Sequence, residues 1–278
     1  MKLRRALRVW WIDALALAVA SIVFVVPFIF IFLTSTKDQL DASHLAFSLP
    51  VHWQLIENLQ TVFATRNYVV IRALVNSLLL TVGSVTLIVL LSALVGFVLQ
   101  RRVDRTGRIV GILMLAGLIV PPSIVPTIFV LQALGLFKTL VGLVLVEIAF
   151  TMPFAILIFR TFMSAIPRDL DEAAIMDGAS PMALFFRVIL PLLRPAIITV
   201  IVVTSVAIYN EFVLPLYFLP GAGNETAQLT LFNFQSQFST QWNLLFGDVL
   251  LITIPPLIVF IFFNRQLVSG LGSGAVKG

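Results

Sequence analysis

The segment IRALVNSLLLTVGSVTLIVLLSALVGFVL, residues 71–99, decides the fold class of this chain. Apart from Arg72 it carries no charged side chain. A helix needs about 20 apolar residues to cross the hydrocarbon core of a bilayer. Five further segments meet this requirement: residues 10–33, 109–134, 140–163, 196–215 and 244–264. The sequence therefore predicts an all-α, polytopic membrane protein with six transmembrane helices in a single domain over residues 1–278.

The composition excludes most soluble classes of protein. The chain is 60% hydrophobic and 11% charged, whereas a soluble domain is about 45–50% apolar and about 25% charged. It has no cysteine, which excludes disulfides, thiolate metal sites and cysteine nucleophiles. His44 and His52 lack metal-ligand spacing and no H-E-x-x-H motif occurs, so we expect neither a metal site nor protease chemistry. The net charge of +5 is interpreted as membrane topology, because no soluble basic face is available to bind nucleic acid.

The basic residues predict the orientation of the spans. Fourteen of the 18 Lys and Arg residues fall in the N-terminal stretch, the connections at 101–108 and 160–194, and the C-terminal tail. The other four are Lys37, Arg66, Arg72 and Lys138. Because cytoplasmic loops collect Lys and Arg, we expect both termini to be cytoplasmic and segments 34–70 and 216–243 to be on the outer face. The first apolar run is expected to be a retained anchor, since it is too long for a signal peptide and lacks a small-residue cleavage site.

The connection at residues 166–194 is too polar to span the membrane and too patterned to be a plain loop. Three acidic residues follow Pro167, which suits a first helical turn, and they favour a helix N-terminus: Asp169, Asp171 and Glu172. Gly178 is placed to end this helix in a left-handed conformation. Ser180 and Pro181 restart a second helix as N-cap and first-turn proline. The second helix is expected to present an apolar face and to end at prolines before the fifth span; these residues are Met182, Phe185, Phe186 and Ile189 for the face, and Pro191 and Pro195 for the breaks.

Two interpretations of this two-helix loop, residues 166–194, follow from the residues alone. It is either an amphipathic hairpin anchored in the lipid headgroups or a docking element that fits a cleft on a soluble partner. Four of the 13 acidic residues of the chain fall within residues 169–177. Acidic side chains are poor anchors at the negatively charged inner leaflet, and the composition therefore favours docking.

The two-helix loop also carries a specific pattern, Glu172-Ala173-Ala174, then Gly178, then Ile189-Leu190-Pro191. This pattern resembles the "EAA…G…I-LP" loop of the permeases of binding-protein-dependent ABC importers. The resemblance extends over most of the chain. It includes NSLLLT at 76–81, LGLFKTLVGLVLV at 134–146, IPRDLDEAAIMDGAS at 166–180, YNEF at 209–212 and GAVKG at 274–278. Together these segments resemble the smaller, six-span permease of maltose-type carbohydrate importers, with Asn210-Glu211 in place of the commoner Asn-Asp.

The resemblance implies both partners and site residues. A permease of this kind pairs with a second permease subunit, two cytoplasmic ATPase subunits and an extracytoplasmic substrate-binding protein, within the lipid of a bacterial inner membrane. It implies that the two-helix loop is the coupling helix seated in a cleft of the ATPase. The residues expected to couple to the ATPase are Glu172, Ala173, Ala174, Asp177, Gly178, Ile189, Leu190 and Pro191. It also implies that the last outer loop can contact the binding protein, through Gly221, Ala222, Gly223 and Asn224; from the residues alone this segment can equally be a plain turn.

Four residues are candidates for the substrate path: Glu147, Tyr209, Asn210 and Glu211. Sugars offer hydroxyls and apolar ring faces, which suit an aromatic ring beside amide and carboxylate groups. Ionisable residues within a membrane bundle usually face its interior or a water-filled cavity. Other readings remain open. Glu147 could be protonated and bonded to a neighbouring helix, Glu211 could extend to the interface, and residues 209–211 could form an interfacial belt.

The source of energy is expected to lie outside this chain. No G-x-x-x-x-G-K-[ST] motif is present, so no cofactor is expected on this chain, and ATP with Mg²⁺ is expected on the partner ATPase. Transport of a sugar or oligosaccharide by alternating access is the favoured function. One alternative is import of glycerol phosphodiester or polyol compounds, and another is an ion-coupled secondary carrier, which would need ionisable groups in the bundle.

Prolines are expected to interrupt three of the predicted spans. They are Pro121, Pro122 and Pro126 in the third, Pro153 in the fourth, and Pro255 and Pro256 in the sixth. Each removes a backbone hydrogen bond and permits a kink. Bent helices around a central cavity suit alternating access, although each proline alone can be an ordinary packing kink.

Overall fold

The computed structural model describes residues 2–102, 104–221, 223–236 and 239–275. Four of the helices in these ranges are long and apolar enough to cross a membrane: α1 (Lys2–Ser35), α4 (Val69–Arg101), α7 (Leu140–Met163) and α14 (Trp242–Ala275). Two bent helix pairs raise this number to six if each pair is one span. Because the described residues form helices and no named strand, the prediction of an all-α, polytopic membrane protein is confirmed.

The third predicted span is broken rather than kinked. Helix α5 (Arg105–Ile119) and helix α6 (Ile124–Ala133) meet at an angle of 118°. Pro121 and Pro122 lie in the break, where proline removes N–H donors and its ring excludes the helical conformation of the residue before it. Pro126 does not interrupt α6, since it lies in the first turn, where no helical partner is lost. Residues 109–134 are therefore not one continuous helix.

The fifth predicted span also has a different end. Helix α11 (Arg194–Tyr209) stops before residue 215, and α12 (Val213–Phe218) follows as a separate short helix. Glu211 accepts hydrogen bonds from the N–H groups of Val213 (2.8 Å) and Leu214 (3.2 Å). Its carboxylate thereby satisfies the donors at the start of α12, as a capping residue does. This is why the chain turns at residues 210–212 instead of continuing as a helix.

Prolines elsewhere do not break their helices. Pro153 lies inside α7, and Pro255 and Pro256 lie inside α14, and both helices are continuous across these positions. These prolines therefore do not divide the fourth and sixth spans into separate helices, and the kinks that they permit stay a prediction. Neighbouring helices and local adjustments can satisfy the backbone groups that a proline leaves free in a membrane helix.

The chain divides into two compact units. One comprises Met1–Ile71 and Thr230–Ile254, and the other comprises Arg72–Leu229 and Pro255–Gly278. In the first unit, the segment after α1 forms α2 (Gln39–Ser43) and α3 (Leu55–Ala64). The buried side chain of Asn58 joins these parts, because its amide donates to the carbonyls of Ser35 (2.9 Å) and Lys37 (2.8 Å) and accepts from Asn243 (2.9 Å).

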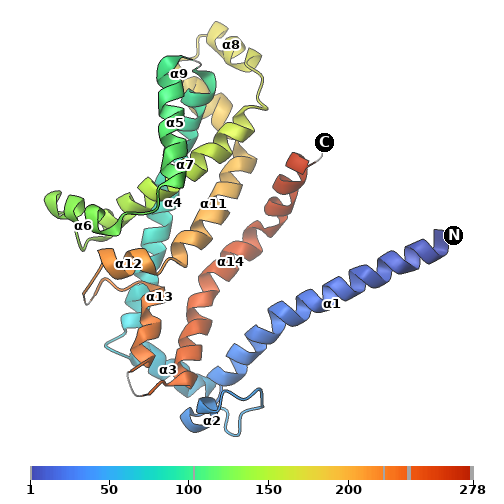
Figure 1. Cartoon of the computed structure of the whole chain (residues 1–278), viewed down its shortest axis with the longest axis vertical. Helices are drawn as coiled ribbons and strands as arrows, with labels where there is room; N and C mark the ends of the chain where they lie inside the picture. The colour runs from blue at the N-terminus through green and yellow to red at the C-terminus, as the bar shows by residue number, and fades with distance from the viewer. Residues whose placement is uncertain (1, 103, 222, 237–238, 276–278) are drawn as a thin grey trace. The chain divides into compact units, whose positions relative to one another are not determined.

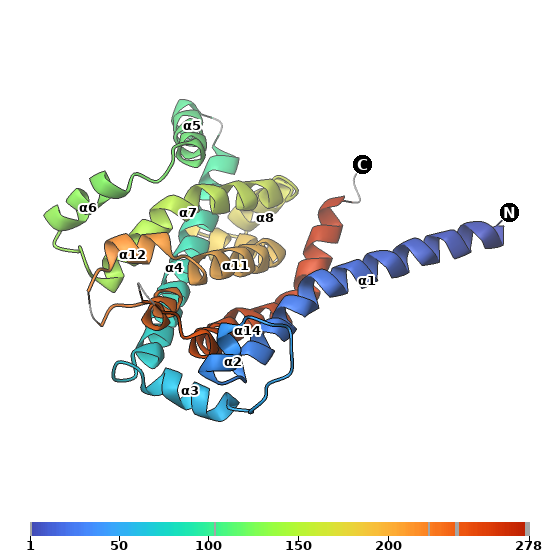
Figure 2. The ribbon, with the colours of Figure 1, turned by 60° about the horizontal axis from the view of Figure 1, so that its bottom comes forward.

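The second unit is built around α7, which packs against α5, α11 and α12. Its core is apolar and includes Leu143, Ala155 and Phe159 of α7 with Phe185 and Ile189 of the two-helix loop, all at most 2% exposed. Figures 1 and 2 show α8 (Asp169–Met176) near one end of α7 and α11, and α6 and α12 near the other. Helix α7 thus connects the side of the unit that carries the two-helix loop to the side that carries α12.

Candidate functional site

The two-helix loop begins with α8, which ends in a tight glycine turn. Gly178 has φ +80°. Its N–H donates to the carbonyl of Ile175 (2.9 Å), and the N–H of Ala179 donates to the carbonyl of Ala174 (2.9 Å). This pair of bonds is the Schellman motif, in which a left-handed residue satisfies the last carbonyls of a helix. The predicted role of Gly178 in ending the first helix is confirmed, although Pro167 lies ahead of α8 rather than in its first turn.

The second part of the loop is one helical stretch that passes through three helix types. It consists of α9 (Pro181–Ala183), the π-helical segment η1 (Leu184–Ile189) and α10 (Leu190–Leu192). The side chain of Ser180 accepts from the N–H of Ala183 (3.3 Å), which confirms the predicted N-cap. Pro191 does not break this stretch, which continues as a helix through Leu192. The bend of 75° before α11 falls at Leu193, and Pro195 lies in the first turn of α11.

The buried face of the second part differs from the predicted one. Phe185 and Ile189 are buried as expected, but Met182 is 61% and Phe186 48% exposed. The remaining buried positions are Leu184 and Leu193. A π-helical turn has more than four residues, so the side chains that face the core shift in register relative to the α-helical spacing on which the prediction depended.

The residues of the "EAA…G…I-LP" pattern separate into two groups. Glu172, Ala173, Asp177 and Gly178 are exposed at the tip of the loop, and Pro191, in α10, is also exposed. Ala174 and Leu190 are partly buried against the core, and Ile189 is completely buried. The first group is available to a partner, whereas the second group attaches the loop to the rest of the unit.

The tip of the two-helix loop combines acidic and large apolar side chains. Met176 is 87% exposed and Ile175 is 59% exposed, next to the exposed carboxylates of Glu172 and Asp177. Large exposed apolar side chains rimmed by polar ones mark interaction surfaces. The arrangement has the character of a docking surface for a protein.

Of the residues predicted for the substrate path, Glu147 is buried in α7, at 3% exposure, and its Oε1 atom has no hydrogen-bond partner among the described residues. It interacts electrostatically with Glu211, so the structure brings these two carboxyl groups to the same region. Asn210 is exposed, donates to the carbonyl of Val206 (2.9 Å) and accepts from Gln228 (3.0 Å). Asn210 and Glu211 therefore both have local structural partners, and their part in the substrate path stays a prediction.

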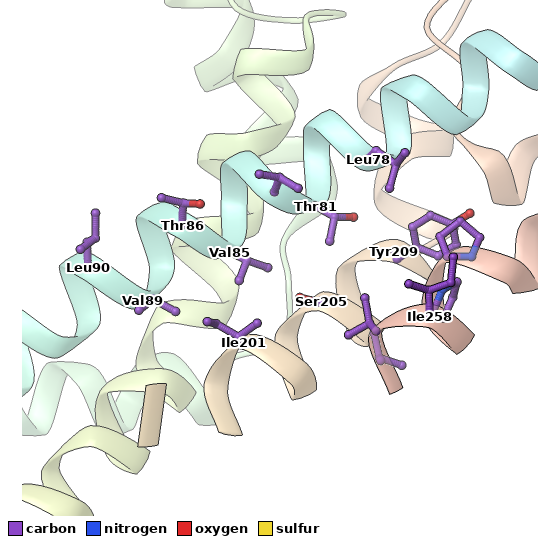
Figure 3. A pocket seen from close by; sticks show the side chains of 15 residues that line it. Leu78, Thr81, Val85, Thr86, Val89, Leu90, Ile201, Ser205, Tyr209 and Ile258 are labelled. Carbon is purple, nitrogen blue, oxygen red and sulfur yellow. The ribbon is translucent and has the colours of Figure 1, made fainter. Parts of the chain in front are cut away.

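Tyr209, the fourth residue predicted for the substrate path, is buried and lines a groove of about 580 Å³. The groove lies between α4, α11 and residues 255–259 of α14, and Figure 3 shows Val85 and Val89 of α4 near Ile201 of α11. Its lining is mainly aliphatic, with a few hydroxyl groups. Those that bear a hydroxyl are Thr81, Thr86, Ser205 and Tyr209.

Residues 221, 223 and 224, which were predicted to lie in the last outer loop, belong to the second unit. Gly221 and Gly223 both have positive φ, at 118° and 97°, which favours glycine at these positions. Asn224 donates to the carbonyl of Lys138 (3.0 Å). The fourth residue predicted to contact a binding protein, Ala222, lies outside the described residues, as does Lys277 of the basic tail.

The several membrane-length helices define a multi-pass membrane protein, and the two-helix loop presents an exposed tip. The family described as "Binding-protein-dependent transport system inner membrane component" matches residues 88–271. The chain belongs to this family, and it is a transport component of an inner membrane rather than an enzyme. The resemblance to importer permeases is thereby confirmed, and the alternative of an ion-coupled carrier is not favoured.

Individual relatives agree with the family over nearly the whole chain. The diacetylchitobiose uptake system permease protein NgcG of Streptomyces coelicolor is 30% identical over 261 residues, which covers 92% of this chain and 85% of that protein. The probable starch degradation products transport system permease protein AmyC of Thermoanaerobacterium thermosulfurigenes is 31% identical, covering 93% and 94%. A solved structure of a bacterial ABC transporter involved in alginate import has the same fold, with a TM-score of 0.81 at 20% identity, covering 94% of this chain and 97% of that chain.

Proposed function

We propose that this chain is the permease subunit of a bacterial importer for a sugar or oligosaccharide. The relatives described above are permeases whose names specify diacetylchitobiose and starch degradation products, and a trehalose transport permease from Mycobacterium tuberculosis is 34% identical over 211 residues. The surface of the groove is mainly aliphatic, and the described residues that line it include no Lys or Arg. A phosphodiester would be better matched by basic side chains, so we favour a neutral carbohydrate over glycerol phosphodiester compounds.

The observation that carries this proposal is the exposed tip of the two-helix loop. Glu172 and Asp177 flank exposed Ile175 and Met176, while Gly178 and Ser180 fix the turn between the two helical parts. We infer that this tip seats in a cleft of a cytoplasmic ATPase and acts as a coupling loop. ATP and Mg²⁺ would bind to two such ATPase subunits, and their closure would move this chain and a second permease subunit between inward-facing and outward-facing states.

Co-purification tests the assignment of partners. An affinity tag on this chain should recover an ATPase, a second permease and, with substrate, an extracytoplasmic binding protein. Replacing Glu172 with lysine reverses a charge at the loop tip and should remove the ATPase from the complex without preventing membrane insertion, since Glu172 is exposed. The variant Asp13→Lys, an exposed acidic position far along the sequence from the loop, should keep the ATPase.

If the wild-type chain purifies alone and still transports a sugar in proteoliposomes without ATP, it is not part of an ATP-driven importer. If Glu172→Lys keeps both the ATPase and uptake, the loop is not the coupling element.

Labelling of single cysteines tests the orientation that the basic residues predict. The chain has no native cysteine. We expect Val51→Cys, at a position 74% exposed in the proposed outer segment, to react with an impermeant maleimide added to intact cells. Thr106→Cys, at an exposed position in the first turn of α5, should react only after the membrane is opened. The reverse pattern would place both termini on the outer face.

A further inference from the structure

At the C-terminus of α4, Arg101 forms a partly buried ion pair with the two-helix loop. Arg101 Nε lies 2.7 Å from Asp171 Oδ2, and Arg101 Nη2 donates to Asp171 Oδ1 (3.1 Å). Both terminal nitrogens of the guanidinium also donate to the carbonyl of Ile166 (3.3 Å). The two charged side chains are only 17% and 13% exposed. Such a two-pronged contact fixes geometry as well as charge, so α8 is oriented directly by α4.

Nearer its N-terminus, α4 is hydrogen-bonded to residues 223–227 of the proposed last outer loop through Asn76 and Ser77. The amide of Asn76 donates to the carbonyls of Gly223 (3.2 Å) and Glu225 (3.0 Å). Ser77 Oγ accepts from the N–H of Ala227 (2.8 Å), in a buried contact. The loop is braced internally as well, since Glu225 Oε2 accepts from the N–H of Gly223 (2.8 Å). Residues 223–227 are therefore attached to α4 at Asn76 and Ser77.

Between these two attachments α4 is a continuous helix without proline. The other three helices of membrane length in the described ranges each contain at least one proline, namely α1, α7 and α14. At about 1.5 Å per residue, Asn76 and Arg101 are separated by about 37 Å along the helix. No proline therefore removes a backbone hydrogen bond of α4 between Asn76 and Arg101, and polar contacts are made at both of these residues.

We propose that α4 links the last outer loop to the coupling loop, with Asn76, Ser77 and Arg101 as positioning residues. The proposal depends on the proposed function, in which the outer loop receives the binding protein and the two-helix loop contacts the ATPase. Docking of a loaded binding protein displaces residues 223–227, α4 moves with them, and Arg101 moves α8 through Asp171. The result is that substrate delivery on one side of the membrane accelerates ATP hydrolysis on the other.

The inner attachment is tested in the complete reconstituted complex by measuring ATP hydrolysis with and without substrate-loaded binding protein. Asp171→Asn and Arg101→Gln should reduce the stimulation by about tenfold while the complex still assembles, because the charged, two-pronged contact is lost. The exchange Arg101→Asp with Asp171→Arg should restore a large part of the stimulation. Arg102→Gln is the matched control, since Arg102 is 61% exposed and its nitrogen lies 4.0 Å from Asp104.

The outer attachment provides the decisive measurement. Asn76→Ala should reduce the same stimulation although it lies about 37 Å along the helix from Arg101. If both attachments belong to one link, the double variant Asn76→Ala with Asp171→Asn should be no worse than the stronger single variant, because a link broken once transmits nothing. Independent structural defects would instead multiply.

Three results would overturn the proposal: stimulation unchanged in the single variants, multiplicative effects in the double variant, or loss of assembly in all variants except Arg102→Gln. The last result would assign the contacts to folding of the loop. Failure of the proposed function itself is distinguishable, because then the wild-type complex would contain no ATPase or show no stimulation by the binding protein.

Discussion

Replacing Gly178 with valine should abolish sugar uptake while the chain still inserts into the membrane. Gly178 has φ +80°, and a side chain in the left-handed region costs about 1–2 kcal/mol, more for a β-branched residue. A Cβ at this position meets no atom within 4 Å, so the cost is conformational and not a clash. The cheapest response is to open the turn and break the two bonds that end α8. Relief of strain thus changes the angle between the two helical parts of the coupling loop, which would no longer fit its partner.

Two variants separate this explanation from a general loss of stability. Gly178→Asn should retain most of the uptake, because asparagine tolerates the left-handed conformation better than other side chains. Gly135→Val imposes comparable strain at φ +69°, again without an atom within 4 Å of the new Cβ, but between α6 and α7. It should keep the ATPase bound. Uptake of labelled sugar and co-purification of the ATPase are the measurements, and uptake by Gly178→Val at the wild-type rate would contradict the role of the turn.

Local rules were sufficient for the features of the loop that depend on neighbouring residues. The glycine that ends α8 and the serine that caps the second part are recognisable because their partners lie within five residues. The same applies to the membrane-length helices, whose apolar runs need no tertiary information. The sequence predicts these conformations because each depends on residues that are neighbours in the chain.

Features that depend on distant contacts could not be predicted in this way. The ion pair joins Arg101 to Asp171 across 70 residues, and Asn76 reaches Glu225 across 149 residues. From the sequence, Arg101 is recognisable only as one of several basic residues that indicate membrane orientation. The groove was missed for a similar reason, since its aliphatic lining from α4, α11 and α14 looks like any lipid-facing surface in sequence. The turn at residues 210–212 was also missed. There the carboxylate of Glu211 caps α12, and a hydropathy pattern gives no sign of such a cap.

Stability of the second unit should be most sensitive at Gly142, in the first turn of α7. Adding a single methyl group, in Gly142→Ala, places a Cβ against the carbonyl oxygen of Leu136 and 3.2 Å from Thr139 Oγ1. The obstructing atom is backbone, and Leu136 cannot easily withdraw, because its carbonyl accepts from Thr139 Oγ1 (2.7 Å). Residues beside it are held too, since the N–H of Lys138 donates to the carbonyl of Phe218 (3.2 Å). Relief of the clash must therefore disrupt the cap of α7, in which the N–H of Gly142 donates to Thr139 Oγ1 (3.0 Å).

We expect Gly142→Ala to cost about 3 kcal/mol, the upper part of the range for overpacking, and to lower the apparent Tm of the detergent-purified complex by about 6–12 °C. Gly83→Ala is the matched control. It adds the same atom in a membrane-length helix of the same unit, α4, where the nearest neighbour of the new Cβ is a methyl group of Val144 at 3.8 Å, an ordinary contact. That variant should melt within about 2 °C of the wild type, since alanine is also the better helix former. Equal melting temperatures for the two variants would mean that the connection from residue 136 to residue 142 yields to an added methyl group. The network of hydrogen bonds around Thr139 would then not be what positions α7, the helix on which the core of the unit is built.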